Sequence, residues 1–205
     1  MASPDVGRSG RNRVAGLGPG RDDVAMDVRQ ASVGDAVRIA EIHVRSWQQA
    51  YQGLISQEYL DSLDPAQRLE RRIELLRMAD GVRVACLVVT SEAGVIEGFS
   101  TIGPTRDDGE DRDRTGEVMA IYLAPDAWGK GLGRELMGAS LRFLAGAGFR
   151  QATLWVLDTN ERARRFYAAA GFVPDGAAKI DTIGGLQVRE VRYRRPLQPA
   201  AAPEA

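Results

Sequence analysis

Residues 117–134 read Glu-Val-Met-Ala-Ile-Tyr-Leu-Ala-Pro-Asp-Ala-Trp-Gly-Lys-Gly-Leu-Gly-Arg. The apolar run from Val118 to Leu123 is typical of a buried strand, and Pro125 lies just beyond its end. A glycine-rich loop follows, and a helical pattern begins after it. Glycine lets the backbone approach a ligand closely, and the first N–H groups of a helix have no partner within the helix. Together with the positive end of the helix dipole, these donors predict a binding site for a pyrophosphate.

The spacing of the glycines indicates which phosphate ligand fits. A P-loop reads Gly-x-x-x-x-Gly-Lys-Ser/Thr, and this loop lacks that spacing. A dinucleotide fingerprint, Gly-x-Gly-x-x-Gly, would place its third glycine at Arg134 if it began at Gly129. If it began at Gly131, the third glycine would fall at Leu136. Neither residue is glycine, which argues against a nucleotide-dependent oxidoreductase. Lys130 and Arg134 add positive charge to the loop.

A second informative block lies further along the chain. Residues 160–172 read Asn-Glu-Arg-Ala-Arg-Arg-Phe-Tyr-Ala-Ala-Ala-Gly-Phe. Phe166 and Tyr167 fall on one face of a helix, Asn160 is a favoured N-cap, and Gly171 suits a left-handed helix end. Taken alone, the block predicts a short amphipathic helix.

The two blocks together resemble the GCN5-related N-acetyltransferase (GNAT) family. The coenzyme A loop of that family reads Arg/Gln-x-x-Gly-x-Gly/Ala, and its later block reads Asn-x-x-Ala-x-x-Phe-Tyr-x-x-x-Gly-Phe. Residues 160–172 match the later block at every named position. In the loop, Trp128 stands where the family most often has Arg or Gln, so one polar side chain is replaced while the backbone donors remain. The resemblance spans roughly residues 27–196.

The resemblance implies an α/β fold of the GNAT type, a single domain with a mixed, mostly antiparallel sheet flanked by helices. Strands at 118–123 and 152–156 are then the splayed central pair, and the pantetheine arm of acetyl-CoA enters between them. A buried backbone group without a partner costs about 1–3 kcal/mol, so a ligand that pairs these groups is favoured. The resemblance assigns the following residues to acetyl-CoA: Ile121, Tyr122, Leu123, Trp128, Gly129, Lys130, Gly131, Leu132, Gly133, Arg134, Asn160 and Tyr167.

Two residues are candidates for the chemistry of acetyl transfer to a primary amine. Glu117 precedes Trp128 by eleven positions, the offset of the catalytic glutamate in histone-type members; a water chain and a plain surface carboxylate are the alternatives. Tyr167 aligns with the family's general acid. A phenol, with a pKa of about 10, is a weaker acid than a thiol at about 8.5, so a hydrogen bond to the leaving thiolate is expected. No side chain stands out as a covalent carrier, which favours direct transfer in a ternary complex.

The first two helices wall the acceptor pocket in the family, which makes His43, Trp47 and Tyr51 the candidate lining. His43 is the only histidine, and packing in the core is its alternative role. The aromatic rings either hold an amine cation or pack the core. Acidic residues at 107–113 could attract a polyamine, although the interspersed arginines favour a solvated loop. Antibiotic, polyamine, amino acid and protein acceptors all stay open.

Composition bounds the partners and the compartment. The net charge of −1 over 205 residues carries no signature of nucleic-acid binding. The lone Cys86 excludes a disulfide framework and favours the cytoplasm, and one His with one Cys gives no basis for a metal site. No stretch reaches the roughly 20 apolar residues of a membrane span. The expected partners are acetyl-CoA and an amine, with a homodimer left open. A non-catalytic acyl-CoA sensor or partner-binding module on the same fold is the alternative function.

The acetyltransferase domain is expected at residues 26–196, between a Gly/Arg-rich tail at 1–25 and an Ala/Pro-rich tail at 197–205. Met26 precedes the first strand-like residues, so translation is expected to begin at either Met1 or Met26. The expected strands are 27–32, 82–90, 95–102, 118–123, 151–157 and 186–197, and the expected helices are 34–51, 65–78, 132–148 and 160–170. A change of apolar phase between Val188 and Val191 predicts a bulge or a half-exposed strand.

Overall fold

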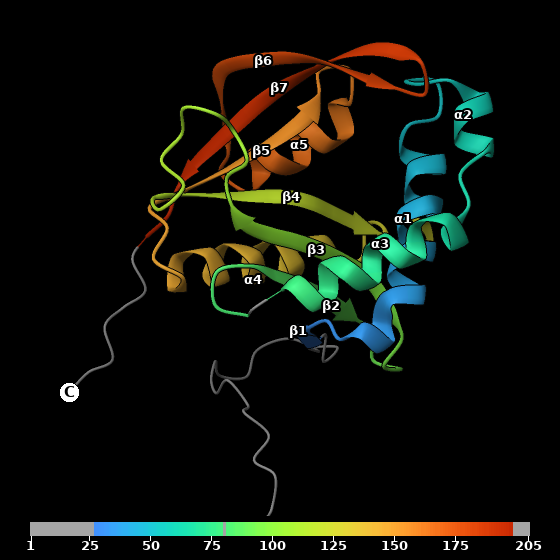
Figure 1. Cartoon of the computed structure of the whole chain (residues 1–205), viewed down its shortest axis with the longest axis horizontal. Coiled ribbons are helices and arrows are strands. Elements are labelled where there is room, and N and C mark those ends of the chain that lie inside the picture. The colour runs from blue at the N-terminus through green and yellow to red at the C-terminus, as the bar shows by residue number, and fades with distance from the viewer. Residues whose placement is uncertain (1–26, 80, 199–205) are drawn as a thin grey trace, which may run out of the picture.

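The computed structural model describes residues 27–79 and 81–198. Within them the chain forms a seven-stranded sheet of order β1-β2-β3-β4-β5-β7-β6 (Figure 1). β4 and β5 are parallel, and the other neighbours are antiparallel, which confirms the expected mixed sheet. The strands are β1 (Asp27–Gln30), β2 (Ala85–Thr90), β3 (Ile96–Pro104), β4 (Thr115–Leu123), β5 (Gln151–Leu157), β6 (Val173–Ile183) and β7 (Leu186–Pro196). The tails expected at 1–25 and 197–205, and the Met26 start, lie outside the described residues, apart from 197 and 198.

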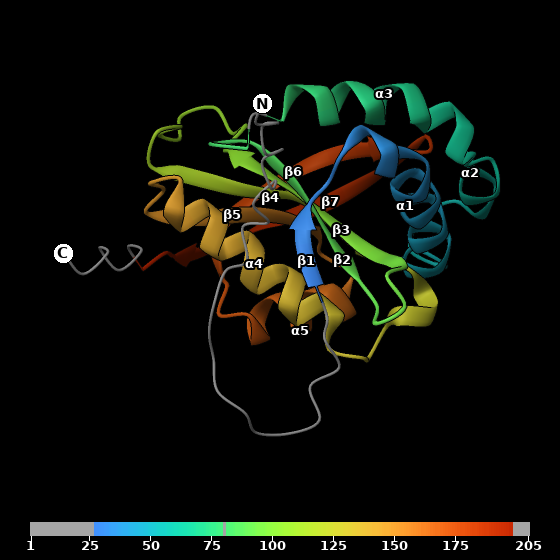
Figure 2. The ribbon, with the colours of Figure 1, turned by 90° about the horizontal axis from the view of Figure 1, so that it is seen from below.

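Helices cover both faces of this sheet. Figure 2 shows α4 and α5 on one side and α1, α2 and α3 on the other. The α-helices are α1 (Ala36–Ala50), α2 (Gln57–Asp61), α3 (Pro65–Met78), α4 (Leu132–Gly146) and α5 (Glu161–Ala169), and the short 3-10 helices are η1 (Val33–Asp35) and η2 (Pro125–Ala127). The link β4–α4–β5 is therefore a strand–helix–strand crossover at the centre of the fold.

Capping side chains set where the helices begin. The Asp64 carboxylate accepts a hydrogen bond from the N–H of Ala66 at 2.9 Å, and Pro65 occupies the first turn of α3. At the start of α5, Oδ1 of Asn160 accepts from the N–H of Ala163 at 3.0 Å. The starts expected near residues 65 and 160 are confirmed.

β4 and β5 separate soon after they meet. Their pairing is confined to Thr115–Glu117 opposite Gln151–Thr153. Beyond Glu117, β4 continues to Leu123 against β3, and the β3–β4 register shifts at Met119 as in a β-bulge. The edge of β4 that faces β5 is consequently unpaired, which confirms the splayed strands.

The sequence pattern does not predict α2 or β6. A five-residue helix is too short to display a helical period. β6 contains Pro174, is exposed at most positions and lies at the edge of the sheet, so it lacks the apolar alternation of a half-buried strand. The bulge expected near Val188 to Val191 lies instead in β6, between Pro174 and Ala178, while β7 is half-exposed.

The main core fills the space between the sheet and its helices. Phe99 and Phe172 are among its fully buried side chains, and Cys86 is buried in β2 as expected. A second, smaller cluster of Ile55, Leu60 and Leu157 joins the α1–α2 region to the end of β5. None of the described helices combines the length and the apolar character needed to cross a membrane.

Candidate active site

A cleft of about 1140 Å³ opens where β4 and β5 part. It brings together most of the residues expected at the site: Trp47, Tyr51, Glu117, Ile121, Tyr122, Leu123, Trp128, Gly129, Gly131, Gly133, Arg134, Asn160 and Tyr167. Three expected residues lie outside its lining. Lys130 is exposed, Leu132 is buried in the core, and His43 lies behind the cleft wall.

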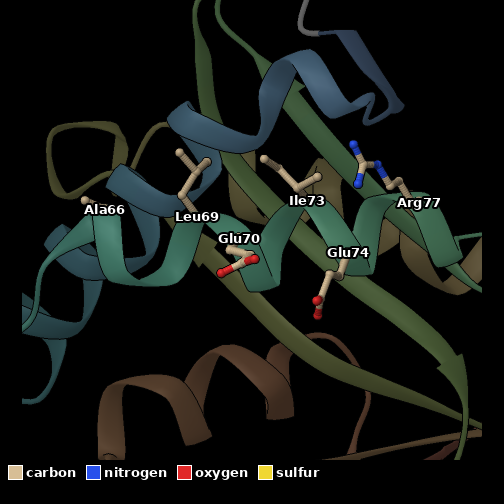
Figure 3. Close-up of a pocket in the computed structure, with 6 residues that line it drawn as sticks. All are labelled: Ala66, Leu69, Glu70, Ile73, Glu74 and Arg77. Atoms are coloured by element: carbon tan, nitrogen blue, oxygen red, sulfur yellow. The ribbon is translucent and has the colours of Figure 1, made fainter.

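A smaller hollow of about 420 Å³ lies on α3, away from this cleft (Figure 3). All of its lining comes from that helix: Ala66, Leu69, Glu70, Ile73, Glu74 and Arg77. Leu69 and Ile73 pack against the core, and the charged side chains belong to a solvated helix face. The larger cleft is therefore the candidate active site.

The glycine loop presents its backbone to the cleft. Gly129 has a φ of 78°, and Gly131, the N-cap of α4, has a φ of 86°, so both adopt a left-handed conformation that favours glycine. Among the described residues, no backbone carbonyl accepts from the N–H groups of residues 129–133. These free donors lie at the positive end of the α4 dipole, an arrangement that suits a phosphate.

Trp128, which stands where the GNAT loop most often has Arg or Gln, anchors the glycine loop. Its indole Nε1 donates to the carbonyl of Leu123 at 3.1 Å, which ties the loop to the end of β4. The guanidinium of Arg162 lies 3.6 Å from the centre of the indole ring and also lines the cleft. Arg162 carries no functional signal in the sequence, because it lies in a block of arginines on a predicted surface helix. Its stacking on Trp128 brings its charge to the loop.

α5 supplies Tyr167 to the cleft wall. The phenol ring packs edge-on against Phe166 and Phe172, at centroid distances of 5.4 and 6.4 Å. Burial, with a smaller effect from Tyr122, raises the pKa of Tyr167 well above its usual value of about 10. The hydroxyl therefore keeps its proton near neutral pH and is available as a donor.

Glu117 lies at the narrow end of the cleft, where β4 and β5 still pair. It is 1% exposed, so the alternative of a surface carboxylate is wrong. Its carboxylate accepts from the backbone N–H of Arg106 at 2.9 Å and from the Arg106 guanidinium at 2.5 Å. Arg106 comes from the loop between β3 and β4, so this loop holds Glu117 in place. Among the described residues, no group of His, Cys, Asp and Glu side chains is placed to hold a metal ion.

The model of the acetyltransferase (GNAT) family matches residues 38–172. The chain belongs to the GNAT family. The uncharacterized N-acetyltransferase YuaI of Bacillus subtilis (strain 168) is 34% identical over 165 residues, covering 80% of this chain and 89% of the relative. The predicted class, an acetyl-CoA-dependent acyltransferase, is confirmed.

Solved structures share this GNAT fold. The PaiA N-acetyltransferase of Thermoplasma acidophilum in complex with coenzyme A superimposes with a TM-score of 0.64 and 21% identity, covering 81% of this chain and 98% of that one. YncA of Salmonella typhimurium, a putative acetyltransferase with acetyl-CoA, superimposes with a TM-score of 0.63 and 24% identity. The match covers 88% of this chain and 98% of that one.

His43 of this GNAT chain sits behind Tyr122 in the cleft wall. Its ring stacks on Tyr122 at 5.0 Å, and Nη2 of Arg72 lies 3.5 Å from its Nδ1. Burial, together with the charges of Arg68 and Arg72, lowers the pKa of His43 to about 3. The imidazole is therefore neutral at physiological pH and supports Tyr122 from behind, as in the alternative role of a core histidine.

This buried imidazole makes folding stability depend on pH. The unfolded chain binds a proton at His43 with a pKa of about 6.5, while the folded chain does so only near 3, so stability is lost as the pH falls below about 6.5. Between pH 7 and 5 we expect His43 to account for a loss of about 2 kcal/mol in the free energy of unfolding. Urea unfolding of the wild type and of His43→Gln at pH 7 and pH 5 measures how steeply the free energy of unfolding changes with pH in each protein. An equal slope in both proteins would contradict the buried neutral ring.

The cleft also contains residues that carry no functional signal in the sequence. They are Tyr59, Arg106, Trp155, Lys179, Asp181 and Glu190. β6 itself was not apparent from the sequence, and Glu190 joins the cleft only through its pairing opposite Leu157. Sheet register brings Trp155, Lys179, Asp181 and Glu190 together, whereas α2 supplies Tyr59 and the β3–β4 loop supplies Arg106, so no local pattern could have identified them.

The acidic loop at 107–113 is held down on the sheet. Asp107 accepts from Nε1 of Trp155 and from Arg192, both at 2.9 Å. Glu110 pairs with Arg192 and Arg194. These carboxylates already have cationic partners, which leaves them a structural role rather than the capture of a polyamine.

Proposed function

We propose that the protein transfers the acetyl group of acetyl-CoA to a primary amine of a small molecule or peptide, by direct attack in a ternary complex. The observation that carries the proposal is one continuous cleft. It joins an anion-binding loop, an unpaired strand edge, a protonated Tyr167 and a buried Glu117.

The chain's groups for the donor lie in sequence along this cleft. The N–H groups of residues 129–133, with Arg134 and Arg162, suit the pyrophosphate. The open edge of β4 around Ile121 and Tyr122 offers backbone groups to the pantetheine amides, since β5 does not pair there. The NH₂ of Asn160 donates to none of the described residues and is free to bind the coenzyme.

The reaction needs a neutral amine and a stabilised thiolate. At pH 7 an amine with a pKa of about 10.4 is protonated, and removing that proton costs about 4.6 kcal/mol. We assign that proton to Glu117, directly or through one water. The amine nitrogen then bonds to the thioester carbon, the carbon–sulfur bond breaks, and the sulfur takes the electron pair. The Tyr167 hydroxyl donates a hydrogen bond to this sulfur, and the low acidity of the phenol makes complete proton transfer unfavourable.

Release of the coenzyme thiol tests the proposed function. The full chain is incubated with acetyl-CoA and a panel of amines, and thiol release is followed against reactions lacking the amine. We expect amine-dependent release and an acetylated product by mass spectrometry. Tight acetyl-CoA binding in calorimetry without turnover on any amine would instead support an acyl-CoA sensor on the same fold.

Glu117→Gln tests the assignment of the base. With an acceptor identified, we expect kcat/KM at pH 7 to fall by at least about tenfold, because the amide cannot take the proton. The loss should shrink at high pH, where the amine loses its proton without help. If kcat/KM at pH 7 falls by less than threefold, the proton of the amine leaves through a water chain and not to Glu117. Urea unfolding of the variant checks that loss of the Arg106 pair has not unfolded it.

A further inference from the structure

The acceptor end of the cleft has a floor made by one face of three strands. Side chains on alternate positions of a strand share a face, and Glu190 lies opposite both Leu157 of β5 and Lys179 of β6. Trp155, two positions before Leu157, belongs to the same face, and Lys179 places its ammonium 4.3 Å from the centre of the Trp155 ring. Leu157 packs with Ile55 and Leu60 of the α1–α2 region, whereas the glycine loop leads into α4 on the other side of the sheet (Figure 2), so we assign this floor to the acceptor.

Two ion pairs face this space. Nζ of Lys179 lies 3.2 Å from Oε2 of Glu190, and the guanidinium of Arg106 pairs with Glu117. Both cations keep unused donors, because Nη1 of Arg106 makes no hydrogen bond to the described residues and the Lys179 ammonium has three protons. Their side chains are 59% and 44% exposed, so a ligand in the cleft can reach them.

The charge balance discriminates between classes of amine. A polycation needs carboxylates without cationic partners, and here Glu117 and Glu190 are both paired. Asp181 adds one carboxylate near the hairpin tip, where it accepts from the N–H of Thr182 at 2.7 Å. The two ion pairs together supply two carboxylates and two cations, which complement a ligand that carries one charge of each sign, and Asp181 is a third carboxylate nearer the hairpin tip.

The tip of the β6–β7 hairpin and α2 border the acceptor end of the cleft. The tip of the β6–β7 hairpin packs on α2, as Figure 1 shows at the right of the sheet. The contact is so close that a Cβ added at Gly184 would lie 2.4 Å from Cγ of Tyr59. With Tyr51 and Trp155 also lining the cleft, its wall at this end is aromatic, which suits an acceptor with an apolar portion.

We propose that the acceptor is a zwitterionic small molecule, a free amino acid, whose carboxylate binds Arg106 and Lys179 while its amino group faces Glu117 and Glu190. This inference rests on the proposed function and specifies its substrate class. The two cations are specificity-determining residues: they recognise the carboxylate and leave the transfer step to the groups already described.

The test compares matched acceptors with the full chain and acetyl-CoA. The twenty free amino acids are screened for thiol release, and the best one is compared with its methyl ester, its decarboxylated amine and spermidine. We expect kcat/KM for the amino acid to exceed that of each analogue by at least about tenfold, since only it carries the carboxylate. Lys179→Met should reduce this preference to less than about threefold through KM. Arg71→Met, which removes an exposed ion pair on α3, should leave the preference unchanged.

Two results would overturn the inference. One is equal or faster turnover of the ester or of spermidine, and the other is a preference that Lys179→Met does not alter. If no amine is acetylated, the proposed function fails. The inference about a zwitterion site is then decided by whether the protein binds free amino acids. Calorimetry then titrates the coenzyme A-loaded protein with amino acids and with their methyl esters. Binding of an amino acid that weakens about tenfold in Lys179→Met supports the zwitterion site, and the absence of any amino-acid binding overturns it.

Discussion

Gly129→Glu will weaken the binding of acetyl-CoA by at least about 100-fold. The substitution puts a carboxylate into the loop whose N–H groups and helix dipole are arranged for the pyrophosphate. At about 5 Å and an effective dielectric constant of about 20, each unit of phosphate charge is repelled by about 3 kcal/mol, and solvent screening reduces this at an exposed loop. A net loss of about 2.7 kcal/mol corresponds to the 100-fold change. Isothermal calorimetry with acetyl-CoA measures it directly.

The other end of the same helix provides the control. Gly148 follows α4, has a φ of 90° and, like Gly129, has open space around the position of an added Cβ. Gly148→Glu therefore introduces the same backbone strain and the same charge far from the loop. We expect its affinity for acetyl-CoA to stay within about twofold of the wild type. Equal losses in both variants would mean that strain, and not an anion site, explains the effect at Gly129.

Short-range geometry explains why the sequence could predict which residues line the end of the cleft that we assign to acetyl-CoA. The strand, the loop and the helix start occupy consecutive residues, and the ligand groups are largely backbone N–H, so their spacing along the chain fixes their geometry. The block at 160–172 is similarly local, because a helical period places Tyr167 and its cap relative to one another.

The end of the cleft that we assign to the acceptor could not be predicted in this way. Lys179 and Glu190 meet across the β6–β7 register, and Arg106 reaches Glu117 from a loop eleven residues earlier. β6 carries Pro174 and few apolar residues, since an edge strand exposed on most positions needs no alternating pattern. His43 is predicted from its helical face, but only packing shows that its ring lies against Tyr122 and Arg72 and does not line the cleft.

Tyr167→Phe will lower kcat by about tenfold or more while the affinity for acetyl-CoA stays within about threefold. The phenyl ring keeps the edge-on contacts with Phe166 and Phe172, so only the hydrogen bond to the leaving thiolate is lost. Tyr193→Phe is the matched control: Tyr193 is buried on the opposite face of β7, where its hydroxyl accepts from Arg164 at 3.1 Å, and it does not line the cleft. That variant should lose about 1 kcal/mol of stability with kcat unchanged.

The pH dependence of the same reaction separates the two roles that Tyr167 could have. Because its pKa is raised above the usual value of about 10, the phenol stays protonated from neutral pH to beyond pH 9. The wild-type rate should therefore rise with pH as the amine loses its proton, with no descending limb from Tyr167 below pH 10. In Tyr167→Phe the profile should keep its shape at a uniformly lower rate. A descending limb near pH 8 that disappears in the variant would identify Tyr167 as an acid of ordinary strength and contradict the buried, hydrogen-bonding phenol.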